Sequence, residues 1–188
     1  MRIVGGRLRG LKLGEVPGAG VRPTSDRVRE SLFNILAHDA DLRTEAGPFP
    51  AGVPVLDVFA GTGALGLEAL SRGATNVSFI ENAPDSLKLL RANIEKARAA
   101  DQVRVLQRDA LAPGRAKEPA GLVLMDPPYH AGLAGPAILA LEVMGWLSPE
   151  VLIVVETDAR EALEVPEGFT LDDERRYGRT KLRTLSRS

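Results

Sequence analysis

The sequence predicts an α/β fold: a doubly wound, mostly parallel sheet that ends in an antiparallel hairpin. Short apolar runs alternate with helical patterns between residues 54 and 156, as in parallel sheets covered by helices. A glycine-rich turn joins the first of these runs to a helix. At the end of the chain two extended runs, 169–177 and 180–187, surround Gly178 as the strands of a hairpin would.

The first residues predict a basic β-hairpin extension. Residues 2–13 read RIVGGRLRGLKL, two strand-like runs around Gly5-Gly6. Cations alternate with apolar residues there, so one face of the hairpin is expected to be basic. Its cations are Arg2, Arg7, Arg9 and Lys12. We expect residues 1–20 to form this extension and residues 21–188 to form the main domain.

A linker and an amphipathic helix are expected next. Residues 14–23 are rich in Gly and Pro, which is typical of a linker. Thr24, Ser25 and Asp26 are good helix N-cap residues. Apolar side chains then recur at helical spacing and predict one buried stripe. The stripe consists of Val28, Leu32, Ile35 and Leu36.

The central unit is a strand, a glycine turn and a helix between residues 53 and 70. Val55, Leu56, Val58 and Phe59 form a short apolar run, typical of a strand buried on both faces. Asp57 interrupts this run, and a buried carboxylate is costly unless another group binds it. The glycines that follow open a helix that Gly73 closes, so the unit can bring backbone close to a nucleotide.

The remaining pattern continues the alternation of strands and helices. Strands are expected at 76–81, 103–106, 122–125 and 151–156, and helices at 83–99 and 138–146. Residues 39–54 and 111–119 are expected to be largely loop, because they contain several prolines and glycines.

Acidic residues stand at or just after the ends of four predicted strands, where open α/β sheets bind their ligands. They are Asp57, Glu81, Asp109 and Asp126. Clustered carboxylates first suggest a divalent metal. These four come from different strands and face a glycine loop suited to a nucleoside. The chain also has no Cys and two His, so we expect no metal site.

Two cofactors fit the glycine loop. Gly61, Gly63 and Gly66 satisfy the G-x-G-x-x-G pattern, and Glu81 follows at the distance of a dinucleotide fingerprint, which suggests NAD(P). In the other interpretation Glu81 accepts from ribose hydroxyls and Asp109 from an adenine amino group. Asp57 then fixes the loop through backbone N–H groups or balances a cationic ligand. These roles favour S-adenosylmethionine, which lacks a pyrophosphate and carries a sulfonium and an ammonium.

The sequence Asp126-Pro127-Pro128-Tyr129 predicts the reaction centre. Two prolines make the turn rigid and leave its carbonyls free to accept hydrogen bonds. Asp126 and the Pro127 carbonyl can together hold one exocyclic NH2 group with its lone pair aimed at a methyl group. Tyr129 can stack on a flipped base. Attack by such an amine needs no prior base, so His130 is not expected to act as one.

The distribution of charge and apolar residues indicates which kinds of partner the protein binds. The net charge is −1, yet residues 1–30 and 174–188 together hold 13 of the 24 Lys and Arg residues. This split suits a polyanion partner. No apolar run approaches the ~20 residues of a membrane helix, and the N-terminus lacks a signal-peptide pattern. We therefore expect a cytoplasmic protein with no membrane partner.

Several stretches give the chain a resemblance to class I S-adenosylmethionine-dependent methyltransferases. Within these it most resembles the bacterial 16S rRNA (guanine(966)-N(2))-methyltransferase family. The matching stretches are RIVGGRLRGLKL, RPTSDRVRESLFNIL (22–36), LDVFAGTGALGLEALSRGA (56–74) and DPPY. The resemblance implies a Rossmann-like methyltransferase domain, methylation of a guanine N2 amino group, and 16S rRNA, within a small-subunit particle, as partner.

The resemblance also places residues near Thr24 and Arg27 over the methionine end of the cofactor. The expected catalytic residues are Asp126, Pro127 and Tyr129. The expected cofactor contacts are Thr24, Arg27, Asp57, Ala60, Gly61, Gly63, Ala64, Glu81, Asn82, Asp109, Ala110 and Asp126. RNA is expected to contact the four cations of the N-terminal extension. Two alternatives stay open: an adenine-N6 methyltransferase acting on DNA, and a nucleoside-binding module without catalysis.

Overall fold

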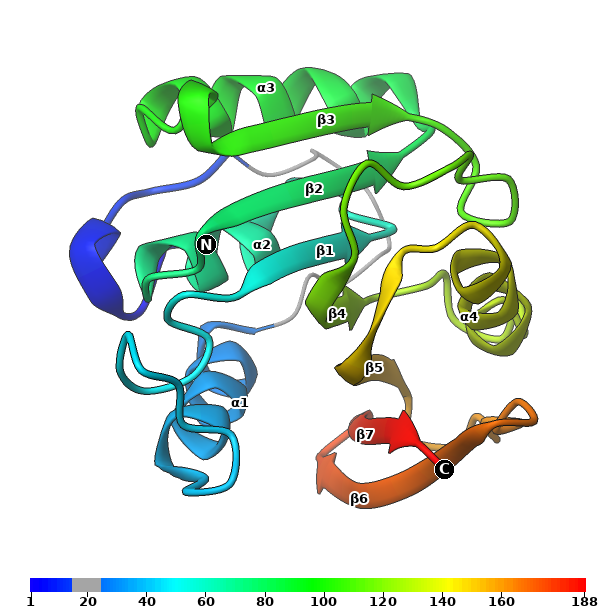
Figure 1. Cartoon of the computed structure of the whole chain (residues 1–188). Helices are drawn as coiled ribbons and strands as arrows, with labels where there is room; N and C mark the ends of the chain where they lie inside the picture. The colour runs from blue at the N-terminus through cyan, green and yellow to red at the C-terminus, as the bar shows by residue number, and fades with distance from the viewer. Residues whose placement is uncertain (15–24) are drawn as a thin grey trace.

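A computed structural model of the chain describes residues 1–14 and 25–188. The described residues form a seven-stranded sheet in the order β3-β2-β1-β4-β5-β7-β6 (Figure 1). Its strands are β1 (Pro54–Val58), β2 (Asn76–Glu81), β3 (Val103–Gln107), β4 (Ala120–Met125), β5 (Leu147–Asp158), β6 (Phe169–Tyr177) and β7 (Thr180–Arg187). Strands β1 to β5 are parallel, and the hairpin of β6 and β7 adds antiparallel to β5. The predicted fold class is confirmed.

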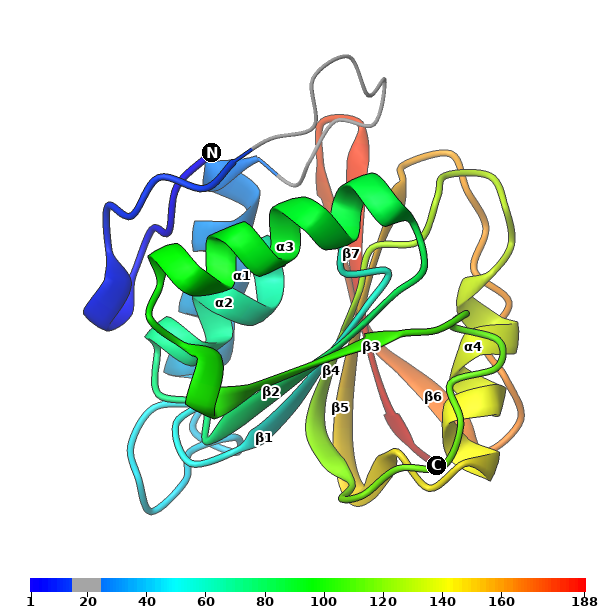
Figure 2. The same ribbon diagram turned by 90° about the horizontal axis from the view of Figure 1, so that it is seen from above.

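Helices cover both faces of the sheet (Figure 2). Helices α1 (Asp26–His38), α2 (Ala64–Ser71) and α3 (Pro84–Lys96) pack on one face, and α4 (Ala134–Val143) packs on the other. Alternate residues of the central strands supply the two cores, because successive side chains of a strand point to opposite faces. Two short 3-10 helices, η1 (Gly6–Leu8) and η2 (Ala100–Gln102), lie outside these layers.

The turn from β1 into α2 depends on close packing. Gly63 is the N-cap of α2 in a left-handed conformation with φ +79°. A Cβ atom there would lie 2.4 Å from Leu90 Cδ1, and one on Gly66 would lie 2.4 Å from Phe79 Cε1. Glycine is therefore required at Gly66 because α2 lies directly against β2, and not because a pyrophosphate approaches it.

Helix α1 begins as predicted. The Ser25 hydroxyl accepts a hydrogen bond from the Val28 N–H at 3.2 Å, which makes Ser25 the N-cap. Val28, Leu32 and Leu36 of the predicted stripe are buried in the core. Thr24, the other candidate cap that precedes Ser25, lies outside the described residues.

Several element boundaries differ from the sequence prediction, and those of β5 and α4 differ most. Strand β5 begins at Leu147 rather than at 151 and continues to Asp158. Its polar end pairs with β7, where Thr157 lies opposite Lys181 and Asp158 opposite Thr180. The pattern of apolar residues does not predict this polar end, because Thr157 and Asp158 pair with the backbone of residues that are distant in sequence. Helix α4 covers Ala134–Val143, so it begins four residues and ends three residues earlier than predicted.

The N-terminal segment pairs antiparallel as expected, but its turn differs from the prediction. The Ile3 N–H donates to the Leu11 carbonyl at 3.0 Å, and an antiparallel bridge joins Arg2 and Lys12. The chain reverses through η1, which begins at Gly6, rather than through a two-residue turn at Gly5-Gly6. The Val4 and Gly5 N–H groups donate to the Glu68 carboxylate of α2, each at 2.8 Å. Next to the turn, therefore, two backbone N–H groups bind a side chain of the main domain instead of pairing across the hairpin.

Residues 1–14, called the N-terminal arm below, pack along α2. Ile3 and Leu13 belong to the same buried core as α1, α2 and α3. The tip of the arm lies beside Ser71, at the C-terminal end of α2, and Arg7 donates to Gln102 of η2. These neighbours stand at the amino ends of the strands (Figure 1). The tip is therefore at the sheet edge opposite the expected ligand site.

Candidate active site

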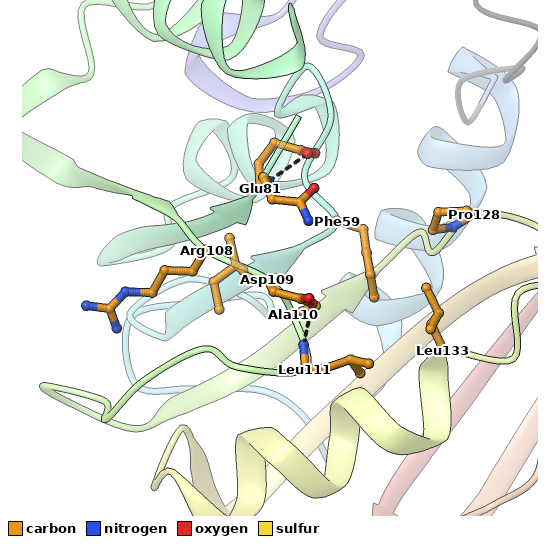
Figure 3. A pocket seen from close by; sticks show the side chains of 10 residues that line it. Phe59, Glu81, Arg108, Asp109, Ala110, Leu111, Pro128 and Leu133 are labelled. Atoms are coloured by element: carbon orange, nitrogen blue, oxygen red, sulfur yellow. Dashed lines mark hydrogen bonds between the residues drawn. The ribbon is translucent and has the colours of Figure 1, made fainter. Parts of the chain in front are cut away.

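A cleft of about 200 Å³ opens at the carboxyl ends of the central strands (Figure 3). Its walls come from β1, β2 and the segments that follow β3 and β4. The lining residues are Phe59, Ile80, Glu81, Asn82, Arg108, Asp109, Ala110, Leu111, Pro128 and Leu133. The location agrees with the general rule for ligands of open α/β sheets.

Glu81, the last residue of β2, fixes the glycine loop. Its Oε2 accepts from the Gly61 N–H at 2.7 Å, and its Oε1 accepts from the N–H groups of Asn82 and Ala83 at 2.8 Å each. A carboxylate offers about four lone-pair sites, so about one acceptor site remains beside these three bonds. The sequence pattern predicts only a ribose contact for this residue and does not reveal its structural function.

Asp57 lies behind the loop, 1% exposed. Its Oδ2 accepts from the Gly66 N–H at 2.8 Å, as expected for a residue that fixes the glycine segment. Its Oδ1 is buried and has no hydrogen-bond partner among the described residues. Burial, and secondarily the charge of Glu81, raise the pKa of Asp57 well above its usual range. Burial therefore favours the neutral, protonated form of the Asp57 side chain.

The third acid, Asp109, turns the chain after β3. Its Oδ1 accepts from the Leu111 N–H at 2.9 Å, which bends the segment around Ala110. In Figure 3 the Arg108 side chain points away from Asp109, and its Nη1 donates to the Pro113 carbonyl at 2.6 Å. Asp109 therefore presents its carboxyl group at the cleft wall.

The opposite wall is apolar. Figure 3 shows Phe59, Pro128 and Leu133 on one side of the opening, across from Glu81 and Asp109. Phe59 follows β1 with φ +59°, an unusual backbone conformation for a residue other than glycine. One apolar wall and one acidic rim suit a flat ring that carries N–H or O–H donors on its edge, as a nucleoside does.

The Asp126-Pro-Pro-Tyr129 turn stands beside this cleft. The Asp126 N–H donates to the Val58 carbonyl at 3.4 Å, which ties the turn to the end of β1. Pro128 lines the cleft. The Tyr129 hydroxyl forms a hydrogen bond with Thr180 of β7. Burial, followed by the charges of Glu156 and Asp126, raises the pKa of Tyr129 to about 12, so Tyr129 is neutral at pH 7.

The structure brings part of the predicted site together. Glu81, Asn82, Asp109 and Ala110 line the cleft. Other predicted residues form the loop and helix start behind it or the turn beside it: Asp57, Ala60, Gly61, Gly63, Ala64, Asp126, Pro127 and Tyr129. Arg27 is exposed in the first turn of α1 and is not among the lining residues of the cleft. Thr24 lies outside the described residues.

Sequence reasoning missed the apolar lining and two polar supports. Phe59, Leu111 and Leu133 resemble core residues in the sequence, and only their positions after strand ends or before a helix distinguish them. Asn93 of α3, buried, donates to the Thr62 carbonyl of the glycine loop. Thr180 supports Tyr129 from the terminal hairpin. Both polar supports lie far from the site in sequence, so no local pattern marks them.

Two further observations concern metal-binding groups and membrane-spanning helices in the described residues. Within residues 1–14 and 25–188, no group of three or more His, Asp or Glu side chains could hold a metal ion. Across the same residues, no helix is both long and apolar enough to cross a membrane.

The cations of the N-terminal arm differ in their pairing. Arg2 lies 3.5 Å from the Asp26 carboxylate, and Arg7 donates to Gln102 at 2.7 Å. Arg9 and Lys12 have exposed side chains. All four stand on the arm, so a phosphate backbone that bound them would run along the α2 side of the molecule.

The known proteins that this chain resembles include several methyltransferases. The chain is 39% identical to ribosomal RNA small subunit methyltransferase D of Escherichia coli, over 100% of this chain and 90% of that protein. The solved structure of the Escherichia coli protein yhhF has 39% identity and a TM-score of 0.82, covering 100% and 98% of the two chains. A methyltransferase of Thiobacillus denitrificans, solved with S-adenosyl-L-homocysteine, shares the fold at 19% identity and a TM-score of 0.55, covering 72% and 49%.

The family comparison spans nearly the whole chain. The model of one protein family matches residues 1–186, so the arm and the terminal hairpin belong to the shared unit as much as the sheet does. The chain therefore belongs to the family described as Conserved hypothetical protein 95.

Proposed function

We propose that this protein transfers a methyl group from S-adenosylmethionine to the N2 amino group of a guanine in 16S rRNA. The observation that carries the proposal is the rigid Asp126-Pro-Pro-Tyr129 turn beside a nucleoside-shaped cleft. The 39% identity to a ribosomal RNA small subunit methyltransferase supports rRNA as the substrate. The guanine N2 position comes from the family resemblance of the sequence and from the chemistry of the turn.

The residues of the cleft fit S-adenosylmethionine. Asp57, behind the loop, has one buried oxygen without a partner among the described residues, and a cationic ligand close by would favour its charged form. Glu81 keeps acceptor capacity for ribose hydroxyls, and Asp109 for an adenine amino group. Phe59 and Leu133 supply apolar surface for the adenine ring. When bound, the cofactor supplies an electrophilic methyl group.

The turn holds the target amine. Asp126 and the Pro127 carbonyl are two acceptors that can take both hydrogens of one exocyclic NH2 group and orient the nitrogen lone pair. Tyr129 presents a neutral ring for stacking on the base, because its pKa of about 12 keeps it protonated. Asp126 also opposes the positive charge that develops on the attacking nitrogen.

RNA binding belongs to a second surface, the basic arm. Arg2, Arg7, Arg9 and Lys12 would contact phosphates, while the turn selects the base, since phosphate contacts position and base contacts specify. The setting we propose is the cytoplasm, with the rRNA in a small-subunit particle.

A methylation assay tests the proposal. Unmodified 16S rRNA, small-subunit particles and double-stranded DNA are each incubated with the protein and methyl-labelled S-adenosylmethionine. We expect label in the rRNA or the particle and none in DNA, with the rate of incorporation about 10²–10³ lower in Asp126→Ala. Label in DNA adenine would favour the adenine-N6 alternative, and binding of S-adenosylmethionine without transfer to any substrate would favour the non-catalytic module.

A further inference from the structure

Asn93 connects two parts of the protein that are far apart in sequence. Its side chain is completely buried on α3. The Nδ2 group donates to the Thr62 carbonyl at 2.9 Å, and Oδ1 accepts from the Gly14 N–H at 2.8 Å. Thr62 lies between the two glycines of the cofactor loop, and Gly14 is the last described residue of the N-terminal arm.

The arm is also attached at its other end. Glu68 accepts from the Val4 and Gly5 N–H groups. The Ser71 hydroxyl donates to the Gly5 carbonyl at 2.5 Å and accepts from the Leu8 N–H at 2.8 Å. Glu68 and Ser71 belong to α2, the helix that begins directly after the glycine loop. The arm is therefore bound at two places, to α2 near its tip and to Asn93 at Gly14.

Only an amide serves both contacts of residue 93. One side of the group must donate to a carbonyl and the other must accept from an N–H, which Asn provides with its two ends. An Asp carboxylate can still accept from Gly14 but places an oxygen against the Thr62 carbonyl. Because buried polar groups keep their hydrogen-bond partners, a shift of the loop at Thr62 would move the Asn93 side chain and with it the contact at Gly14.

We propose that Asn93 is a positioning residue for S-adenosylmethionine and links the glycine loop to the N-terminal arm. Binding of the cofactor, which fixes the loop, then stabilises docking of the arm at Gly14. By thermodynamic reciprocity, a docked arm raises cofactor affinity by the same factor. The phosphate-binding arm and the cofactor pocket lie on different surfaces, and this link makes each sensitive to the state of the other.

Cofactor binding to two matched variants tests the first half of the proposal. Asn93→Asp breaks the loop contact, and Asn34→Asp makes the same chemical change on an exposed residue of α1. We expect calorimetry with S-adenosyl-L-homocysteine to show about 10-fold weaker binding for Asn93→Asp, the effect of removing one buried hydrogen bond, and wild-type binding for Asn34→Asp. In turnover, KM for S-adenosylmethionine should rise while kcat at saturation changes little. Equal affinity in both variants would overturn the proposal.

Amide hydrogen exchange of the wild-type protein tests the second half without any variant. Adding S-adenosyl-L-homocysteine should slow exchange of the Gly14 amide severalfold, and Asn93→Asp should remove this effect. Ser71→Ala serves as the control, because it loosens the arm at Leu8 without touching the loop, so the effect at Gly14 should persist.

The outcomes separate this proposal from the cofactor assignment, on which it rests. If the wild-type protein binds S-adenosyl-L-homocysteine but Gly14 exchange is unchanged, the link through Asn93 is wrong and the cofactor assignment stands. If the wild-type protein binds neither S-adenosyl-L-homocysteine nor S-adenosylmethionine, the cofactor assignment itself fails. The exchange experiment on the wild-type protein decides the matter even if Asn93→Asp does not fold.

Discussion

At the scale of single residues, the acids at the strand ends differ in what surrounds them. Glu81 is occupied by three backbone N–H groups, whereas Asp57 is buried with one hydrogen bond. Asp109 is exposed at the cleft wall. One sequence pattern, an acid at or near the end of a strand, therefore covers three different environments: a loop anchor at Glu81, a buried acid at Asp57 and an exposed acceptor at Asp109.

Burial of Asp57 makes stability depend on pH in a defined direction. Desolvation raises its pKa above the ordinary 3.8 in the folded protein, so folding favours the protonated form. This contribution is fully present below pH 3.8 and disappears as pH rises through the folded pKa. Asp57→Asn lacks this titration. We expect the free energy of unfolding of the variant, relative to wild type, to increase from about pH 4 to the folded pKa.

Urea unfolding of both proteins between about pH 4 and 8, without cofactor, measures this difference. Asp101→Asn, an exposed residue before β3, provides the control and should track wild type at every pH. A relative stability of Asp57→Asn that falls as pH rises would contradict the sign.

Substitutions at Asp126, Tyr129 and His130, in and next to the turn, should lower activity to different extents. Asp126→Ala removes an acceptor of the target amine and should lower kcat by about 10²–10³, as for a transition-state hydrogen bond elsewhere. Tyr129→Ala removes the stacking ring and should severely impair turnover. Tyr129→Phe keeps the ring, removes only the hydrogen bond with Thr180, and should therefore be less impaired in turnover than Tyr129→Ala. His130→Ala should cost much less than Asp126→Ala. Steady-state turnover measures kcat of each variant, and calorimetry with S-adenosyl-L-homocysteine checks that cofactor affinity is retained. Equal decreases in kcat in the His130 and Asp126 variants would refute a mechanism without a base.

At the scale of elements, a buried ionic group attaches the arm to the domain. Glu68 of α2 lies 2.8 Å from Arg72 and 3.6 Å from Arg29, and the side chains of Glu68 and Arg29 have no exposed surface. Arg29 also donates to the Arg2 carbonyl of the arm. The group thus joins α1, α2 and the arm at a point that apolar packing alone would not define.

Removing the charge of Glu68 should be strongly destabilising. Glu68→Gln keeps the shape but weakens a buried ion pair, a change that typically costs about 3–5 kcal/mol. Chemical denaturation should show this decrease, while Glu164→Gln at an exposed position should stay within about 0.5 kcal/mol of wild type. If the two variants were equally stable, the ionic group would not contribute to arm docking.

The elements also show what the sequence could predict. The bounds of β2 and of the terminal hairpin were predicted correctly, because apolar alternation and Gly178 mark them locally. The turn of the arm was not, because its backbone partners, Glu68 and Ser71, lie more than sixty residues away. In the site, acids and glycines carry a local signal, whereas the apolar lining and Asn93 depend on tertiary packing.

At the scale of the whole molecule, the tip of the basic arm and the cleft lie at opposite ends of the sheet. The tip stands at the amino ends of the strands (Figure 1). The cleft is lined by residues at and after their carboxyl ends. A substrate held at both points would extend along the molecule. This arrangement suits a large structured RNA better than a nucleoside or a short oligonucleotide.

The salt dependence of RNA binding tests the role of the arm. Arg7→Ala combined with Arg9→Ala should weaken rRNA binding. The slope of log affinity against log salt should fall by roughly 0.7–0.9 for each phosphate that the variant no longer neutralises. Arg98→Ala combined with Arg115→Ala removes two cations outside the arm and should leave the slope unchanged. A slope that stays the same in the arm variant would mean that these cations are only solvated surface.

The proposed function depends on the Asp126-Pro-Pro-Tyr129 turn holding a guanine amino group of 16S rRNA for methylation. Mass spectrometry of nucleosides from 16S rRNA, treated free and within small-subunit particles, tests this dependence most directly. We expect N2-methylguanosine, at most one per rRNA molecule, formed about 10²–10³ more slowly by Asp126→Ala. Formation of N6-methyladenosine instead, or the absence of any methylated nucleoside from a protein that binds S-adenosylmethionine, would contradict it.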